Sequence, residues 1–441
     1  MNNTSTILMI YGTPLLVILS YYIIKKKRYH KQSLSFLEES RAAKLTEPAS
    51  LHPIINPVEC IGCGTCVSAC PEHNVLGLIA NKAQLVNPTN CIGHGACKTA
   101  CPQDAIKLVF GSETRGVDIP DVSPEFETSV KGLFIAGELG GMGLIKNAIE
   151  QGRQVMEFIQ KKVSKNTSKN VLDCFIVGAG PAGLSATLQA KSVGLKTMTI
   201  DQDTVGGTVA HFPRGKLVMT APAQLPMVGK VKFSEISKES LMEFWMGVIQ
   251  EKKIKVHEKE MLKEIQKEND NLFSIKTNNN EYQSKSILLA IGRRGTPRKL
   301  GVPGEEKTKV AYRMIDPEQY KNDFVLVVGG GDSALEAACS IAELGQSKVS
   351  ISYRSESFSR AKPKNRTRIK TLEEQGKLQV LMSSNVVCIE DKSVDISIKT
   401  NTSEKTITIK NSAIIICAGG ILPTPFLKSI GINVTTKYGT E

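Results

Sequence analysis

Seven cysteines and one histidine fall in two short runs whose spacing could hold a metal–sulfur centre. The first run reads C-x-x-C-x-x-C-x-x-x-C-P, and the second repeats this frame with a histidine at its second position. Such spacing is typical of iron–sulfur cluster ligands, because several thiolates must reach one cluster from a short segment. The predicted ligands are Cys60, Cys63, Cys66, Cys70, Cys91, His94, Cys97 and Cys101.

The other four cysteines stand singly among apolar residues, and we expect them to be small buried hydrophobic side chains. They are Cys174, Cys339, Cys388 and Cys417. Free thiols and oxygen-sensitive clusters both indicate a reducing compartment.

A glycine-rich loop after a predicted strand at 174–177 indicates a first dinucleotide site. The loop leads into a helical segment, and the next strand, at 197–200, ends at Asp201. Glycines at this spacing let the backbone approach a pyrophosphate, and the helix N-terminus stabilises its charge. Asp201 would accept hydrogen bonds from ribose hydroxyls. The predicted loop contacts are Gly178, Gly180, Pro181, Ala182 and Gly183.

A second glycine-rich loop follows a predicted strand at 324–328. Its partner strand, at 348–353, ends without an acid and is followed by Arg354 and Arg360. An arginine at this point suits the 2′-phosphate of NADP, so NADPH is favoured over NADH, with generic surface charge as the alternative. The predicted contacts are Gly329, Gly331, Asp332, Ser333, Ala334, Arg354 and Arg360.

The N-terminal region predicts a single-pass membrane anchor. Thr6–Ile24 carries no charge, and a lysine- and arginine-rich flank follows at once, within a chain of net charge +13. The apolar stretch is just long enough to span a bilayer, and the positive flank would place the body of the protein in the cytoplasm and contact lipid head groups. We therefore expect the protein to be located at the cell membrane. The alternative is that the hydrophobic helix docks on the protein itself.

Four motifs in order resemble the thioredoxin-reductase-like flavoproteins, over roughly residues 111–441. They are GAGPAG (178–183), LLAIGRRGTPRKLGVPGE (288–305), VVGGGDSALEAA (327–338) and IIICAGGILPTPFL (414–427). The resemblance implies FAD at the first loop and NAD(P)H at the second, with the NAD(P) domain inserted into the FAD domain. Gly206 and Gly207 match glycines near the flavin in that family.

Two departures from the family pattern are informative. The closing segment of the family, here Lys131–Gly152, precedes the FAD loop, which indicates a circular permutation. Within it, Gly137 and Glu138 stand where the family has glycine and a flavin-contacting aspartate. The redox C-x-x-C before the NADPH loop is absent from Val310 onward, which argues against dithiol exchange.

Residues 57–108 resemble the bacterial two-cluster ferredoxins, in which the fourth cysteine of each run ligates the other cluster. By that resemblance cluster A would take Cys60, Cys63, Cys66 and Cys101, and cluster B would take Cys70, Cys91, Cys97 and His94. A three-iron cluster beside His94 and a cluster with an open site are the alternatives at cluster B. One [4Fe–4S] cluster and a second [4Fe–4S] or [3Fe–4S] cluster are expected.

The sequence thus predicts an α/β fold with two Rossmann-like domains for FAD and NAD(P), a small α+β ferredoxin-like domain before them, and one N-terminal transmembrane helix. The predicted boundaries are 1–31 anchor and basic flank, 32–54 linker, 55–110 ferredoxin-like domain, 111–160 permuted segment of the FAD domain, 161–170 linker, 171–300 FAD domain, 301–412 NAD(P) domain, and 413–441 return to the FAD domain.

The predicted function is a membrane-anchored oxidoreductase that passes electrons from NAD(P)H through FAD to iron–sulfur clusters and then to an acceptor. The acceptor would be a protein or a membrane redox component, and flow toward NAD(P)⁺ is also open. The alternatives are a disulfide reductase and a non-catalytic membrane redox sensor. No acid–base catalytic residue and no nucleic-acid-binding motif is found, and a homodimer is suggested by analogy with the family.

Overall fold

The computed structural model of the protein describes the backbone of residues 3–42, 46, 48, 51–72, 74–91, 93–113, 116–141, 143–163, 170–212, 214–219, 222–233, 235–269, 272–293, 295–359, 361–399 and 403–439. Within these ranges the side chains of residues 3–11, 217, 219, 235 and 296 are outside the description. The chain divides into two units, Met1–Gly116 with Lys437–Glu441, and Val117–Thr436.

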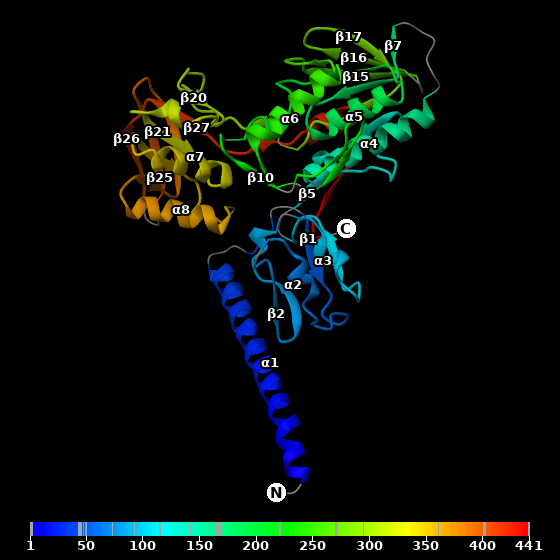
Figure 1. Ribbon diagram of the computed structural model, residues 1–441. Helices are drawn as coiled ribbons and strands as arrows, with labels where there is room; N and C mark the ends of the chain where they lie inside the picture. The colour runs from blue at the N-terminus through cyan, green and yellow to red at the C-terminus, as the bar shows by residue number, and fades with distance from the viewer. Residues whose placement is uncertain are drawn as a thin grey trace. The chain divides into compact units, whose positions relative to one another are not determined.

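The first unit begins with one long helix, α1 (Asn3–Ala42), the blue helix of Figure 1. Residues 32–42, expected to be linker, are helical because the end of α1 packs on the neighbouring hairpin. Ser33 and Ser40 are buried, and the Ser40 hydroxyl donates to Asn87 Oδ1 at 2.7 Å. A Cβ atom added at Gly77 would lie 2.5 Å from the Ser33 hydroxyl oxygen, so helix and hairpin approach closely.

The predicted membrane anchor at Thr6–Ile24 is not supported. Over the residues with described side chains, no helix is both long and apolar enough to cross a membrane. The first part of the expected span, residues 6–11, lies outside those residues. The expected lipid contact and membrane location, which depended on this anchor, are likewise not supported.

The rest of the first unit repeats one small pattern, a cysteine-rich loop followed by a short helix. Strand β1 (His52–Ile55) pairs antiparallel with β4 (Ile106–Val109), and β2 (Leu76–Ile79) pairs antiparallel with β3 (Lys82–Leu85). The helices are α2 (Thr65–Ala69), η1 (Pro88–Asn90) and α3 (Ala96–Thr99). One hairpin, one antiparallel pair of distant strands and short helices make the α+β unit that the sequence predicts.

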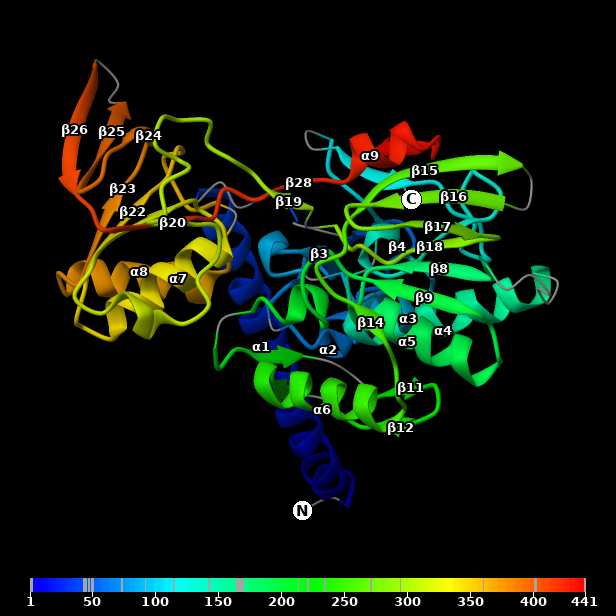
Figure 2. The ribbon, with the colours of Figure 1, turned by 90° about the horizontal axis from the view of Figure 1, so that it is seen from above.

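The second unit contains a five-stranded parallel sheet with the order β14-β9-β8-β18-β6. Its strands are short and almost wholly apolar, as in sheets covered on both faces. They are β6 (Leu133–Ile135), β8 (Cys174–Val177), β9 (Thr197–Ile200), β14 (Val256–His257) and β18 (Ile287–Leu289). Figure 2 shows β8, β9 and β18 side by side.

Strand β6 completes this sheet although it precedes β8 in the chain. Leu133 pairs with Ile287 in parallel, so β6 forms the edge beside β18. The following helix α4 (Ile145–Lys162) packs against α5 (Pro181–Ser192), and a Cβ atom added at Gly152 would lie 2.1 Å from the carbonyl oxygen of Ala182. The segment before the first glycine-rich loop therefore occupies the closing position that the sequence predicts for it.

A second parallel sheet has the order β20-β27-β21-β22-β23. Helices α7 (Asp332–Glu343) and α8 (Pro363–Glu374) lie side by side against it (Figure 2). An antiparallel sheet of three strands packs nearby. The strands are β20 (Val310–Ala311), β21 (Phe324–Val328), β22 (Lys348–Ser352), β23 (Leu378–Leu381), β24 (Ser384–Ile389), β25 (Ser393–Lys399), β26 (Glu404–Lys410) and β27 (Ala413–Ile416).

The boundary expected at residue 413 differs from the structure. Strand β27 belongs to the second parallel sheet, and the chain returns only at β28 (Gly420–Ile421), which pairs with β19 (Thr296–Pro297). The remaining elements are β5 (Val117–Pro120), η2 (Glu138–Gly140), β7 (Val171–Leu172), η3 (Gly207–Val209), β10 (Leu217–Met219), β11 (Ala223–Leu225), β12 (Gly229–Val231), β13 (Glu235–Ser237), α6 (Lys238–Glu251), β15 (Leu262–Asn269), β16 (Leu272–Thr277), β17 (Glu281–Ser284), η4 (Pro317–Tyr320), α9 (Thr424–Ser429) and β29 (Val434–Lys437).

Candidate iron–sulfur and dinucleotide sites

One cavity of the first unit, cavity A, is lined by four cysteines. Three come from the first run and one from the end of the second: Cys60, Cys63, Cys66 and Cys101. The remaining lining is uncharged, with Ile61 and Pro102 among it. These are the four ligands that the ferredoxin resemblance assigns to cluster A.

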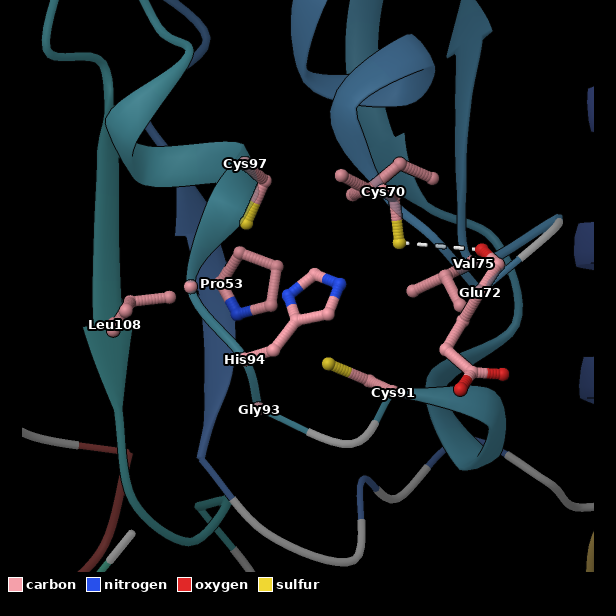
Figure 3. Close-up of a pocket in the computed structure, with 11 residues that line it drawn as sticks. Pro53, Cys70, Glu72, Val75, Cys91, Gly93, His94, Cys97 and Leu108 are labelled. Carbon is pink, nitrogen blue, oxygen red and sulfur yellow. Dashed lines mark hydrogen bonds between the residues drawn. The ribbon is translucent and has the colours of Figure 1, made fainter. Parts of the chain in front are cut away.

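A second cavity, cavity B, is lined by three cysteines and one histidine. They are Cys70, Cys91, His94 and Cys97, and Figure 3 shows the His94 ring lying among the three sulfur atoms. The structure therefore brings together the two ligand sets with the exchange of Cys70 and Cys101 that the resemblance implies. Among the described residues, no three Cys, His, Asp or Glu side chains lie close enough together to hold a single metal ion.

Glycines shape both cysteine loops. Gly64 and Gly95 precede α2 and α3 in the left-handed conformation, each at a φ of 79°. This conformation turns the chain sharply and favours glycine. Cys66 and Cys97 follow on the helices and are buried, so each loop directs its thiols toward a cavity.

Burial disfavours the thiolate form of four of the cysteines that line the two cavities. Burial raises the pKa of Cys66 and of Cys91 to about 11, and it also raises the pKa of Cys70 and Cys97. Cys63 is the exception, because its hydrogen bond with the Thr65 hydroxyl lowers its pKa. Bound iron supplies the charge that stabilises buried thiolates, so this donor set fits iron–sulfur clusters.

His94 lies in cavity B with one buried ring nitrogen that has no hydrogen-bond partner among the described residues. Its Nδ1 accepts a hydrogen bond from the Ala96 N–H at 3.3 Å, whereas its buried Nε2 has no hydrogen-bond partner among the described residues. Burial lowers the pKa of His94. A buried nitrogen without a partner costs free energy unless a ligand satisfies it. Because Nδ1 accepts the Ala96 N–H, the neutral ring carries its proton on Nε2. Neutral imidazole is a competent iron ligand, but binding through Nε2 requires the other tautomer, with the proton on Nδ1 and the Ala96 hydrogen bond given up.

The first glycine-rich loop uses its glycines for two purposes. A Cβ atom added at Gly178 would lie 2.5 Å from the Ala290 carbonyl oxygen, and one at Gly183 would lie 1.8 Å from the Gly178 carbonyl oxygen. At Gly180 the nearest atom to such a Cβ is 3.9 Å away, on Gly207. Gly178 and Gly183 thus permit strand–helix packing, and Gly180 leaves open space in which a pyrophosphate fits. Pro181 and Ala182 begin α5, whose N-terminus favours that charge.

Asp201 is held against this loop. Its Oδ2 accepts a hydrogen bond from the Ala179 N–H at 2.7 Å, and its Oδ1 accepts one from the Asp203 N–H at 2.9 Å. Burial raises the pKa of Asp201. Each carboxylate oxygen keeps a second lone pair, so the group is still able to accept a ribose hydroxyl.

The closing segment brings further predicted residues to the same place. A Cβ atom added at Gly137 would lie 3.0 Å from the Ala182 side chain, and Glu138 begins η2 next to it. Gly206 donates its N–H to the Ala179 carbonyl oxygen at 2.9 Å, and Gly207 follows at the start of η3. A cavity beside Leu139 is lined by Asp118 and Arg293, neither of which was predicted from the sequence as a site residue.

The second glycine-rich loop leads from β21 into α7. A Cβ atom added at Gly329 would lie 2.4 Å from the Cys417 carbonyl oxygen, whereas Gly331 has no atom within 4 Å of such a position. Asp332 begins α7, and its Oδ1 accepts hydrogen bonds from the Lys362 N–H and the Asn365 side chain, both at 2.8 Å. The loop is open where a phosphate would bind, and Asp332 fastens the start of α8 beside it.

The other predicted contacts of this loop differ in accessibility. Ser333 follows Asp332 on α7, and Ala334 is buried against Gly329. Arg354 is exposed just beyond β22, and Arg360 lies outside the described residues.

None of the eleven cysteines forms a disulfide. Cys174 and Cys339, expected to be buried, are fully buried, in separate cores of the second unit. The same expectation is wrong for Cys388 and Cys417, which are partly exposed: Cys388 lies on β24, and Cys417 directly follows β27. Outside the two cysteine runs, the sequence therefore contains no C-x-x-C thiol pair.

Fold and sites together define an FAD-containing NAD(P)H oxidoreductase that carries an iron–sulfur domain. The chain belongs to the pyridine nucleotide-disulphide oxidoreductase family, which matches residues 175–439, and residues 52–102 match the 4Fe-4S dicluster domain. The resemblances seen in the sequence and the cofactors FAD, NAD(P)H and iron–sulfur are thereby confirmed.

Individual relatives match about 60% of the chain. The ferredoxin–NADP reductase of Ignicoccus hospitalis is 29% identical over 270 residues, covering 60% of this chain and 83% of that protein. The bacilliredoxin reductase Bdr of Bacillus subtilis is 26% identical over 269 residues, covering 60% of this chain and 82% of that protein. The structure of bacillithiol disulfide reductase Bdr from Staphylococcus aureus aligns with a TM-score of 0.52 at 25% identity, covering 62% of this chain and 86% of that one.

Proposed function

We propose that this protein is an NAD(P)H-dependent reductase that passes electrons through FAD to two iron–sulfur clusters of its own and then to an acceptor protein. The observation that carries the proposal is the pair of cavities, each with four ligand side chains, in the same chain as a flavoprotein half. FAD accepts two electrons as hydride and the clusters take electrons singly, which is the chemistry these groups supply when bound.

The same relatives suggest two kinds of electron acceptor, a disulfide and a ferredoxin. A disulfide reductase of this family type would need a thiol pair within reach of the flavin. Here the C-x-x-C pairs all belong to the cluster runs, and Cys174 and Cys339 are buried in separate cores. The proposal therefore follows the ferredoxin-reductase relatives, with the ferredoxin-like unit as the internal acceptor.

We also propose that His94 completes cluster B. The position of its ring among Cys70, Cys91 and Cys97 supports this assignment over an open site or a three-iron cluster. Ligation through the buried Nε2 requires the tautomer with its proton on Nδ1, in which the Ala96 hydrogen bond is given up. Replacing a thiolate by neutral imidazole removes one negative charge, so cluster B would have a higher reduction potential than it would with four thiolates.

The proposed contacts of each dinucleotide follow from the same placement. FAD would lie on the Gly178–Gly183 loop with Asp201, Gly206–Gly207 and Gly137–Glu138, and NADPH on the Gly329–Ala334 loop with Arg354. The experiment that tests the function is an anaerobic reduction of the purified protein with NADPH, in which flavin absorbance and cluster signals are followed together. Loss of flavin absorbance with no cluster reduction would contradict the proposal.

A further inference from the structure

Glu260 is a buried carboxylate that three side-chain donors satisfy. It is 2% exposed, and its Oε1 accepts hydrogen bonds from the Thr277 hydroxyl at 2.7 Å, the Tyr282 hydroxyl at 2.9 Å and the Asn280 amide at 3.1 Å. Its Oε2 lies 3.4 Å from His257 Nδ1. Burial opposes ionisation of Glu260, but these hydrogen bonds outweigh it and lower its pKa. A buried carboxylate with this many partners fixes the geometry around it.

The turn that contains Glu260, residues 257–260, is bonded to the segment 201–205. The Asp201 N–H donates to the His257 carbonyl oxygen at 2.8 Å, and the Glu260 N–H donates to the Asp201 carbonyl oxygen at 2.9 Å. Two further hydrogen bonds join the Lys259 N–H to the Asp203 carbonyl oxygen (3.0 Å) and the Val205 N–H to Glu258 Oε1 (2.8 Å).

The shape of this turn depends on its contacts. Lys259 has a φ of 57°, in the left-handed region. A residue with a side chain adopts that conformation at an energetic cost, so surrounding interactions must hold it there. The anchored side chain of Glu260, the next residue, is such an interaction.

The segment 201–205 is in turn bonded to the first glycine-rich loop at both of its ends. Asp201 accepts the Ala179 N–H at 2.7 Å, and Gly206, directly after the segment, donates to the Ala179 carbonyl oxygen at 2.9 Å. A continuous set of hydrogen bonds therefore runs from Glu260 through Asp201 to the loop.

We propose that Glu260 is a positioning residue for FAD, acting through Asp201 and the 201–206 segment rather than by touching the cofactor. This inference rests on the proposed placement of FAD at the Gly178–Gly183 loop. Without the Glu260 carboxylate, Thr277, Asn280 and Tyr282 lose their common acceptor and the 257–260 turn loses its anchor. Asp201 and Gly206 then lose the fixed spacing that the ribose and pyrophosphate require.

The test compares two substitutions in the full-length protein by measuring the dissociation constant of FAD. Glu260→Ala removes the shared acceptor, and we expect the dissociation constant to rise about tenfold or more. Glu260→Gln keeps an amide oxygen at the Oε1 position, where all three donors bind, so we expect a value within about threefold of the unchanged protein. Tyr282→Phe removes one donor and should give an intermediate increase, which keeps the test open if Glu260→Ala fails to fold.

The matched control is Ser286→Ala in the same domain. The buried Ser286 hydroxyl donates to the Asp173 carbonyl oxygen at 2.7 Å, away from the 201–206 segment. We expect this variant to lower the unfolding midpoint and leave FAD affinity unchanged. If Glu260→Ala or Tyr282→Phe lowers the midpoint in the same way without weakening FAD binding, Glu260 is structural only and the inference is wrong.

Failure of the proposed function gives a different result. If NADPH never reduces the clusters of the unchanged protein, the electron path is wrong, and the FAD affinities of the Glu260 variants still decide the inference. If Gly180→Ala leaves FAD affinity unchanged, the placement of FAD on this loop is wrong, and the inference falls with it.

Discussion

Cys70 and His94 line the same cavity, although they belong to different cysteine runs. Cys70 follows α2 in an extended conformation and is not among the residues that line cavity A, which holds the other cysteines of its run. Cys101 does the reverse and joins Cys60 in cavity A. Each run therefore depends on the other, and the two predicted clusters share one folded unit.

The shared cavities predict which cluster each cysteine supports. Cys101→Ser should abolish cluster A and leave cluster B detectable by EPR, because it removes a ligand from cavity A only. Cys70→Ser should have the opposite effect. Cys63→Ser and Cys97→Ser are the matched controls, because each lies in the cavity of its own run. The account is contradicted if Cys101→Ser gives the spectrum of Cys97→Ser.

A substitution of His94 should change cluster B and leave cluster A intact. His94→Cys should keep four irons and lower the reduction potential of cluster B, because thiolate restores a negative charge. His94→Ala should give a three-iron EPR signal in the oxidised protein. The potentials come from an EPR-monitored redox titration. An unchanged cluster B potential in both variants would show that His94 is not a ligand.

The loop glycines predict two distinct effects of added methyl groups. Gly183→Ala places a Cβ atom against the Gly178 carbonyl oxygen and should destabilise the whole FAD domain. Gly180→Ala meets no atom closer than 3.9 Å, so it should fold normally but bind FAD more weakly by about tenfold.

Gly247→Ala provides the control for both. Gly247 lies inside α6 with open space around it, so alanine there should raise the free energy of unfolding by about 0.5–1 kcal/mol. FAD titration and thermal unfolding measure the two effects separately. Equal FAD affinity in Gly180→Ala and in the unchanged protein would contradict the assignment of this loop.

Arg354 predicts the preference for NADPH over NADH. Arg354→Ala should lower kcat/KM for NADPH about tenfold and leave kcat/KM for NADH nearly unchanged, because only NADPH carries the 2′-phosphate. Lys370→Ala is the control, since Lys370 is an exposed charge on α8. Similar losses in the two variants would mean that these residues act only as general surface charge.

Motifs set by chemistry could be predicted from the sequence, and long-range packing could not. The spacing of Cys60, Cys63 and Cys66 is imposed by one small cluster, so it is visible in a short segment. The closing strand was predicted from the pattern around Gly137 and Glu138, and the pairing of Leu133 with Ile287 agrees with it.

The rest depends on contacts between distant segments. Nothing near Ser33 in the sequence indicates that it packs against Gly77, so the end of α1 was expected to be linker. Glu260 is likewise an ordinary charged residue in the sequence, and only the fold brings Thr277 and Tyr282 to it. The anchor predicted from apolar composition alone is not supported by the described part of the chain.

The most direct test of the central claim is low-temperature EPR of anaerobically purified protein before and after NADPH, with flavin absorbance recorded on the same sample. We predict that reduced-cluster signals appear as flavin absorbance is lost, and that Cys101→Ser and Cys70→Ser each remove a different one of them. Loss of flavin absorbance while both clusters stay oxidised would contradict electron transfer from FAD to the ferredoxin-like unit.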